Sequence, residues 1–167
     1  TEIGGRVAIE SRLPGLSQWR RVADYRDYQI SQMANIEVFF DSRLTAEQVL
    51  EFGADHVVLA TGSKWARHGI GRHNHDPIPT AETATVLTPD EIAAGVIPEG
   101  PVVIFDDDHY YMGGVMAEKL RLEGLDVTYV TPVAEASTWT HNTMEQAKIQ
   151  TRLLELGVNI VPFRNLT

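Results

Sequence analysis

The fold of this chain is constrained most by one short stretch, the strand–turn–helix–strand pattern over residues 102–130. Val102–Phe105 is a run of four apolar residues, as expected for a strand that is covered on both faces. A polar turn follows, then a helix over Met112–Glu123 that ends at Gly124, and then a second strand, Val127–Val130. Strand, helix and strand within about 30 residues predict a βαβ unit with parallel strands.

The rest of the chain also predicts strands and helices in alternation, which is typical of an α/β fold. Apolar residues at three- and four-residue spacing favour a helix over 17–34, and Thr45 with Gln48 predicts a capping box that begins another. Further strands are expected over 36–40, 56–60 and 158–161, and further helices over 88–95 and 143–156. Residues 64–87 lack any period and read as a long connection. The predicted architecture is a Rossmann-like parallel sheet with flanking helices.

Composition and charge argue against several classes of partner and site. With 14 Lys and Arg against 23 Asp and Glu, the formal net charge is −9, whereas nucleic acids and anionic membranes attract a basic face. No apolar run is long enough for a transmembrane helix, and we expect a cytoplasmic protein. The absence of cysteine excludes disulfides, thiolate zinc sites and cysteine-ligated iron–sulfur clusters within this chain. Because the sequence begins with Thr1 rather than Met, we expect a piece of a longer protein.

The turn of the βαβ unit is the place where a Rossmann fold binds a dinucleotide. Such a turn reads Gly-x-Gly-x-x-Gly, which lets the backbone and the helix N-terminus approach the pyrophosphate. Here Asp106 and Asp108 belong to three successive aspartates at the place of the first two glycines, and only Gly113 and Gly114 remain. Each carboxylate beside a phosphate costs on the order of 4 kcal/mol before screening, at an effective dielectric constant of about 20. We therefore predict a degenerate turn that binds neither a dinucleotide nor a metal ion.

Motifs spread along the chain carry a resemblance to one enzyme family. They are Ile3–Val7, Leu13–Leu16, Asp24–Arg26, His56–Gly62, Phe105–Gly114 and Ala134–Gly157. In these motifs the chain resembles the C-terminal half of the family of trimethylamine, dimethylamine and histamine dehydrogenases, NADH:flavin oxidoreductase proteins related to Old Yellow Enzyme. The most specific motif is the Asp-rich turn followed by Tyr-Tyr-Met-Gly-Gly.

The resemblance implies a parent enzyme with FMN on a TIM barrel, a 4Fe-4S cluster, and ADP or FAD on a nucleotide-binding-like domain. It implies an incomplete FAD/ADP-binding-type subdomain over 1–65, a linker with a short helix over 66–95, and a Rossmann-like NAD-type subdomain over 96–167. Six residues would contact ADP or FAD in the complete protein: Gly4, Gly5, Arg6, Ala60, Thr61 and Gly62. Because the main phosphate loop of that subdomain lies outside these residues, we expect the chain alone to bind no cofactor tightly.

Other polar clusters leave a structural and a functional interpretation open. Four residues of one segment are of metal-ligating types: His68, His73, His75 and Asp76. Their segment has no regular period to orient them, which favours a solvated loop over a metal site. Residues 24–28, with two acids and two tyrosines, could be a docking surface for a redox partner, but we favour a solvated helix face on which the tyrosines pack. Tyr110 and Tyr111 could fill the place of the nucleotide, which we favour over a redox role.

The sequence leads to one preferred function and two alternatives. We expect a non-catalytic piece of a flavin- and iron–sulfur-dependent amine dehydrogenase or demethylase that serves as a scaffold and as a docking module for an electron-transfer flavoprotein. No catalytic residue is identified within the chain. The first alternative is the NAD(P)H-binding half of a flavin-dependent reductase related to 2,4-dienoyl-CoA reductase, which requires an open Gly-rich turn. The second is a free-standing interaction domain without cofactors.

Overall fold

The computed structural model describes residues 2–166, which divide into two compact units. The first unit comprises residues 2–12 and 16–63, and the second comprises residues 13–15 and 64–166.

The first unit is helical. It contains α1 (Arg6–Glu10), α2 (Arg20–Ser31) after a short 3-10 turn, and α3 (Ala46–Glu51). The predicted capping box is confirmed: the Gln48 backbone N–H donates to Thr45 Oγ1 at 3.4 Å, and the Thr45 backbone N–H donates to Gln48 Oε1 at 2.9 Å. The helix predicted over 17–34 is confirmed as α2 with its preceding turn, whereas α1 was not predicted, since its five residues are too few to show a helical period.

The prediction of two strands in this unit is wrong. Residues 36–40 and 56–60 are in neither helix nor strand, and Val58 and Leu59 are 88% and 81% exposed. Apolar residues favour a short strand over 36–40, and the consecutive apolar side chains of 56–60 favour a strand covered on both faces. A strand, however, is stable only when a neighbouring strand accepts and donates its backbone hydrogen bonds. Within residues 2–166 the paired strands all lie in the second unit.

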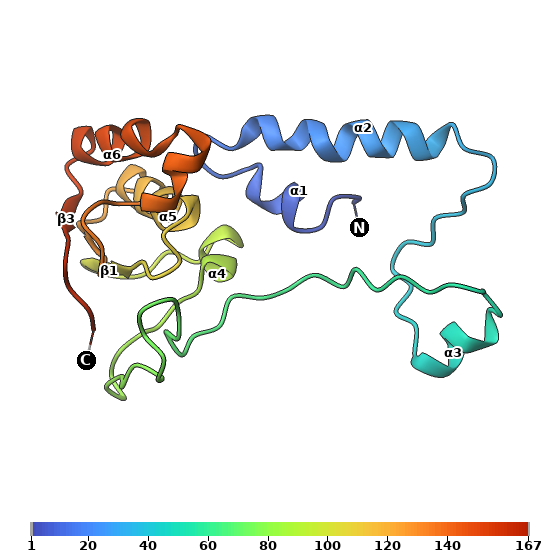
Figure 1. The fold of residues 1–167 in the computed structure, drawn as a ribbon, viewed down its shortest axis with the longest axis horizontal. Helices are drawn as coiled ribbons and strands as arrows, with labels where there is room; N and C mark the ends of the chain where they lie inside the picture. The colour runs from blue at the N-terminus through green and yellow to red at the C-terminus, as the bar shows by residue number, and fades with distance from the viewer. Residues whose placement is uncertain (1, 167) are drawn as a thin grey trace. The chain divides into compact units, whose positions relative to one another are not determined.

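The second unit is an α/β domain built on a parallel sheet (Figure 1). Its strands are β1 (Val102–Phe105), β2 (Val127–Val130) and β3 (Asn159–Val161), in the spatial order β1-β2-β3. Both pairs are parallel, with Val102 opposite Val127 and Tyr129 opposite Ile160. Helix α5 (Tyr111–Leu122) connects β1 to β2, which confirms the βαβ unit and the α/β fold class. Helices α4 (Pro89–Ala93) and α6 (Gln146–Glu155) agree with prediction, and residues 64–87 form the expected irregular connection.

The core of the second unit lies between its sheet and its helices. Leu120 of α5, Tyr129 of β2 and Leu153 of α6 are almost completely buried. Helices α5 and α6 lie side by side (Figure 1). They approach so closely that a Cβ atom on Gly114 would lie 2.8 Å from Ile149 Cγ2. Because Gly114 has no side chain, helices α5 and α6 can pack this closely at its position.

The helices of both units are short. The longest, α2 and α5, have 12 residues each, which corresponds to about 18 Å of helix against about 30 Å of bilayer hydrocarbon. Among residues 2–166, none of the helices has the length and apolar character that crossing a membrane requires.

Candidate functional site

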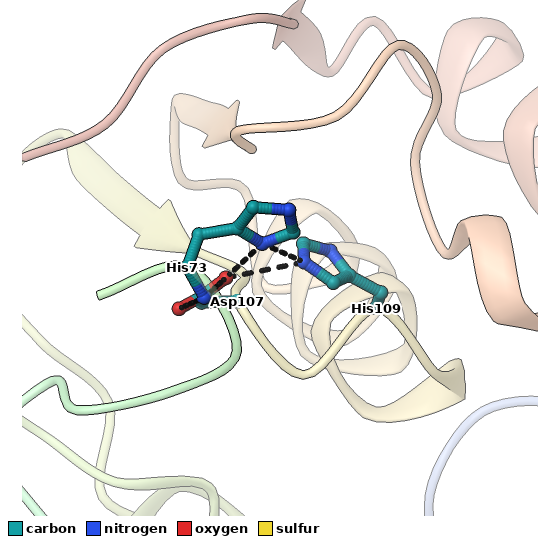
Figure 2. Close-up of side chains that lie close together, drawn as sticks. All are labelled: His73, Asp107 and His109. Carbon is teal, nitrogen blue, oxygen red and sulfur yellow. Dashed lines mark hydrogen bonds and ion pairs between the residues drawn. The ribbon is translucent and has the colours of Figure 1, made fainter. Parts of the chain in front are cut away.

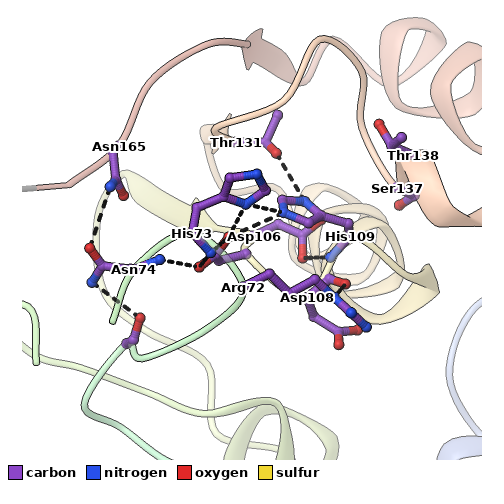
Figure 3. A network of polar contacts seen from close by, with 12 residues as sticks. Arg72, His73, Asn74, Asp106, Asp108, His109, Thr131, Ser137, Thr138 and Asn165 are labelled. Carbon is purple, nitrogen blue, oxygen red and sulfur yellow. Dashed lines mark hydrogen bonds and ion pairs between the residues drawn. The ribbon is translucent and has the colours of Figure 1, made fainter. Parts of the chain in front are cut away.

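The turn between β1 and α5 holds the polar residues that the sequence singled out. Three of its residues, Asp106, Asp107 and His109, are 4%, 6% and 1% exposed, which is unusual for a connection between elements. Each makes a different set of contacts, and Figure 3 shows the resulting polar network with the neighbouring segment around His73. The side chains of Asp106 and Asp107 therefore do not belong to one acidic cluster.

Asp106 points into the domain. Its carboxylate accepts a hydrogen bond from the His109 backbone N–H at 3.1 Å and another from the Tyr129 hydroxyl. Burial raises the pKa of the Asp106 carboxyl, although these two donors favour its charged form. Burial, together with the charge of Asp106, also raises the pKa of the Tyr129 hydroxyl, which keeps this group protonated as a donor. Asp106 and Tyr129 thus join the turn to the neighbouring strand β2.

The Asp106 carboxylate lies against the first turn of helix α5. A Cβ atom on Gly113 would lie 2.8 Å from Asp106 Cγ, so helix and carboxylate are in direct contact. Asp106 Oδ1 accepts the His109 N–H, a backbone donor of the turn that leads into the helix. A pyrophosphate needs both the space and the backbone donors of such a turn. The residues present do not fit a dinucleotide bound in the Rossmann manner.

Asp107 points the other way, toward the segment 71–74 of the long connection. It accepts hydrogen bonds from the backbone N–H groups of His73 and Asn74, each at 2.9 Å. Burial alone would raise the pKa of the Asp107 carboxyl. The Asn74 and His73 donors outweigh burial, so the pKa lies below its ordinary value and the group is a carboxylate at neutral pH.

Arg72 adds further contacts between the segment 71–74 and the turn. Its Nε donates to the Asp108 backbone carbonyl at 2.9 Å, and its guanidinium lies 4.0 Å from the centre of the Trp139 ring. The Arg72 backbone N–H also donates to the Asp107 carbonyl. Asp108 takes part in these contacts through its backbone carbonyl. Its side chain therefore does not hold the turn in place as the carboxylates of Asp106 and Asp107 do.

His73, Asp107 and His109 bring three ligand-type atoms together (Figure 2). His73 Nδ1 lies 2.9 Å from Asp107 Oδ1, His109 Nε2 lies 3.1 Å from the same oxygen, and the two nitrogens are 3.0 Å apart. His109 has a left-handed backbone with φ of 63°, uncommon for a residue other than glycine, and this conformation turns its buried ring toward His73. His73 is the exposed member, with 47% of its side chain accessible.

The structure groups the histidines differently from the sequence-based prediction. His73 joins the turn, whereas His68, His75 and Asp76 are not members of this cluster. His68 Nδ1 instead accepts the Ile70 backbone N–H at 3.0 Å. The sequence predicted no site role for His109. Its local signal in the sequence is the spacing Asp107-x-His109, within an irregular turn that has no period to orient the two side chains.

The residues expected to contact ADP or FAD lie in the first unit. Gly4 and Gly5 have φ of 118° and 48°, and Gly5 directly precedes α1. Arg6 donates to the carbonyl of Ser63 at 2.7 Å, which places the segment after Gly62 beside the start of α1. A Cβ atom on Gly5 or Gly62 would meet nothing within 4 Å. The segments 4–6 and 60–62 are therefore neighbours, with open space at Gly5 and Gly62. Gly4 is packed, because a Cβ atom there would lie 2.9 Å from Ala23 Cβ.

The comparisons with known proteins identify relatives over nearly the whole chain. The family model of the OYE-like second alpha/beta domain matches residues 87–164. Dimethylamine dehydrogenase of Hyphomicrobium sp. (strain x) is 34% identical over 166 residues, which are 95% of this chain and 22% of that protein.

Solved structures agree with these matches. Histamine dehydrogenase from Rhizobium sp. 4-9 superposes with a TM-score of 0.92 at 56% identity, over 97% of this chain and 26% of that one. For 6-hydroxypseudooxynicotine amine oxidase from Pseudomonas geniculata N1 the values are 0.91 and 46%, over 96% of this chain and 24% of that one. A 2-naphthoyl-CoA reductase, at a TM-score of 0.75 and 21% identity, shares the fold. The chain spans only between 22% and 26% of the length of these relatives.

Proposed function

We propose that this chain, a segment of an oxidoreductase of the dimethylamine and histamine dehydrogenase family, is a non-catalytic scaffold and partner-docking module of its parent flavoenzyme. The observation that carries this proposal is the closed turn after β1. Asp106 fills the place of a pyrophosphate and is held there by Tyr129 and the His109 backbone. A domain with this turn keeps the Rossmann architecture as a structural element.

The cofactors of the proposed parent enzyme are FMN, a 4Fe-4S cluster, and ADP or FAD. A flavin with an iron–sulfur cluster supplies two-electron oxidation of an amine followed by one-electron transfer. This chain has no cysteine for the cluster, and its own contribution would be the two neighbouring segments of the first unit that approach a bound ADP or FAD. We assign residues 1–65 to this incomplete FAD/ADP-type part, 66–95 to a linker and 96–167 to the NAD-type part.

The exposed apolar residues of 56–60 support the view that other parts of the parent enzyme cover the first unit. Val58 and Leu59 expose most of their surface, and apolar surface of this extent usually marks an interface. We propose the TIM barrel of the parent as the partner there, and the cytoplasm as the location of the whole enzyme. No nucleic acid or membrane partner is part of this proposal, given the net charge of −9.

Titration calorimetry with NADH, NADPH and ADP tests whether the turn is closed. We expect no heat of binding for NADH or NADPH at concentrations up to about 1 mM, which means a binding free energy weaker than about −4 kcal/mol. Asp106→Gly/Asp108→Gly removes both carboxylates, and Asp108→Gly alone is the matched control, because the Asp108 side chain does not fill the turn. Micromolar binding of NADH or NADPH by the unchanged chain would contradict the proposal and favour the reductase alternative.

The proposed docking surface is the face of α2 around Tyr25 and Tyr28, which are 58% and 66% exposed and stand among Asp24 and Asp27. Exposed tyrosines are frequent anchors of protein interfaces. In the complete enzyme reduced by its amine, we expect Tyr25→Ala/Tyr28→Ala to slow electron transfer to an electron-transfer flavoprotein by tenfold or more at limiting partner concentration. Leu50→Ala, an exposed apolar residue of α3, is the control. An unchanged rate in the tyrosine variant would remove α2 from the docking surface.

A further inference from the structure

The triangle of His73 Nδ1, His109 Nε2 and Asp107 Oδ1 is a candidate site that the proposed function does not use. We propose that these three atoms bind one divalent first-row transition-metal ion, with the remaining coordination positions open to water on the exposed side of His73. The proposal rests on the geometry and chemistry of the cluster and is independent of the scaffold and docking roles.

The first argument is the spacing of the three atoms. Ligands about 2.1 Å from a metal ion lie roughly 3.0 Å apart when they occupy one face of an octahedron, and about 3.4 Å apart in a tetrahedron. The observed separations are 2.9, 3.0 and 3.1 Å. All three edges of the triangle therefore agree with a facial arrangement of two imidazoles and one carboxylate, a set that suits Zn²⁺, Fe²⁺ and their neighbours.

The second argument is that hydrogen bonds cannot satisfy this triangle. A nitrogen of each imidazole carries at most one proton in the ring plane, and the Asp107 carboxylate carries none. If both nitrogens are protonated, both donate to Asp107 and their two N–H groups face each other across 3.0 Å. If only one is protonated, one edge of the triangle joins two lone pairs. A cation inside the triangle makes all three contacts favourable at once.

The third argument is that the surroundings hold two of the three ligands in place. Asp107 is fixed by the backbone N–H groups of His73 and Asn74. The His109 ring is buried, with its Nδ1 3.5 Å from the hydroxyl of the buried Thr131, so that Nε2 is the nitrogen turned to the cluster. Such outer contacts orient ligands and set which imidazole nitrogen is available. Asp106 is not a fourth ligand, because its oxygens already accept from Tyr129 and the His109 backbone.

Metal titration of the full chain tests this inference. After dialysis against a chelator, calorimetry with Zn²⁺ should give one equivalent bound with a dissociation constant below about 10 μM, and Co²⁺ should give a visible absorption band that Zn²⁺ displaces. His73→Gln should weaken Zn²⁺ binding by tenfold or more. Because His73 is the exposed ligand, the substitution should leave the fold intact. Circular dichroism checks this. His75→Gln, in the same segment but outside the cluster, should bind like the unchanged chain.

Thermal unfolding gives a second readout that does not depend on counting ions. Zn²⁺ should raise the melting temperature of the unchanged chain and of His75→Gln but not that of His73→Gln, because an ion that binds only the folded state stabilises it. Absence of Zn²⁺ binding at about 100 μM, or equal losses in His73→Gln and His75→Gln, would overturn the proposal. The cluster would then be a hydrogen-bonded contact between the turn and the segment 71–74.

Discussion

Replacing Asp106 with alanine should lower the free energy of unfolding of the chain by about 3 kcal/mol or more. The substitution leaves two buried donors, the Tyr129 hydroxyl and the His109 backbone N–H, without their acceptor. Each unsatisfied buried donor costs about 1–3 kcal/mol, and removal of the carboxylate also leaves a void against Gly113. Urea unfolding followed by circular dichroism measures this loss.

Asp108→Ala is the matched control for this experiment. The residue belongs to the same run of aspartates, but its backbone carbonyl, not its carboxylate, accepts from Arg72. Its replacement should change stability by no more than about 0.5 kcal/mol. Tyr129→Phe in combination with Asp106→Ala completes a double-mutant cycle, and a coupling near zero would show that the buried pair does not stabilise the turn as argued. Equal effects of Asp106→Ala and Asp108→Ala would contradict it as well.

The βαβ unit could be predicted because its signals are local. Consecutive apolar residues in β1 and β2, a helical period between them and Gly124 at the helix end all lie within one short stretch. The strands expected over 36–40 and 56–60 carry similar apolar runs, yet they do not form. The difference lies in strand pairing. Strands β1 and β2 are hydrogen-bonded to each other, whereas neither 36–40 nor 56–60 has a strand partner among residues 2–166. Apolar runs therefore indicate where a strand can form, and tertiary pairing decides whether it does.

The candidate site was only partly predictable for a related reason. Asp106 could be identified, since the aspartates replace glycines at a known position of the Rossmann turn. The association of Asp107 with His73 could not, because the two are 34 positions apart in the sequence and His73 lies in an irregular connection before α4 and β1. His109 was equally hidden, because its role depends on a left-handed backbone that a histidine seldom adopts and no sequence period indicates.

Asp107→Ala should release the segment 71–74 and make it far more sensitive to trypsin after Arg72. The carboxylate accepts hydrogen bonds from the backbone N–H groups of His73 and Asn74, and its Oδ1 lies 2.9 Å from Nδ1 of the His73 ring. If their loss lowers the free energy of local opening by about 3 kcal/mol, the open population and the cleavage rate rise on the order of 100-fold. The cleavage rate is measured by mass spectrometry in chelator-treated protein, so that no bound ion contributes.

Two internal comparisons make this result specific to Asp107. Cleavage after Arg67 should change little, because the Arg67 guanidinium is held by Glu91 and the Val86 carbonyl, which the substitution does not touch. Asp76→Ala should leave the rate after Arg72 unchanged, since Asp76 contacts Asn74 through its backbone carbonyl. Faster cleavage at both arginines would mean that the whole domain opens rather than the segment. An unchanged rate after Arg72 in Asp107→Ala would mean that Trp139 and the backbone carbonyls of Asp107 and Asp108 suffice to hold Arg72. The Asp107 carboxylate would then be left as a ligand rather than an anchor.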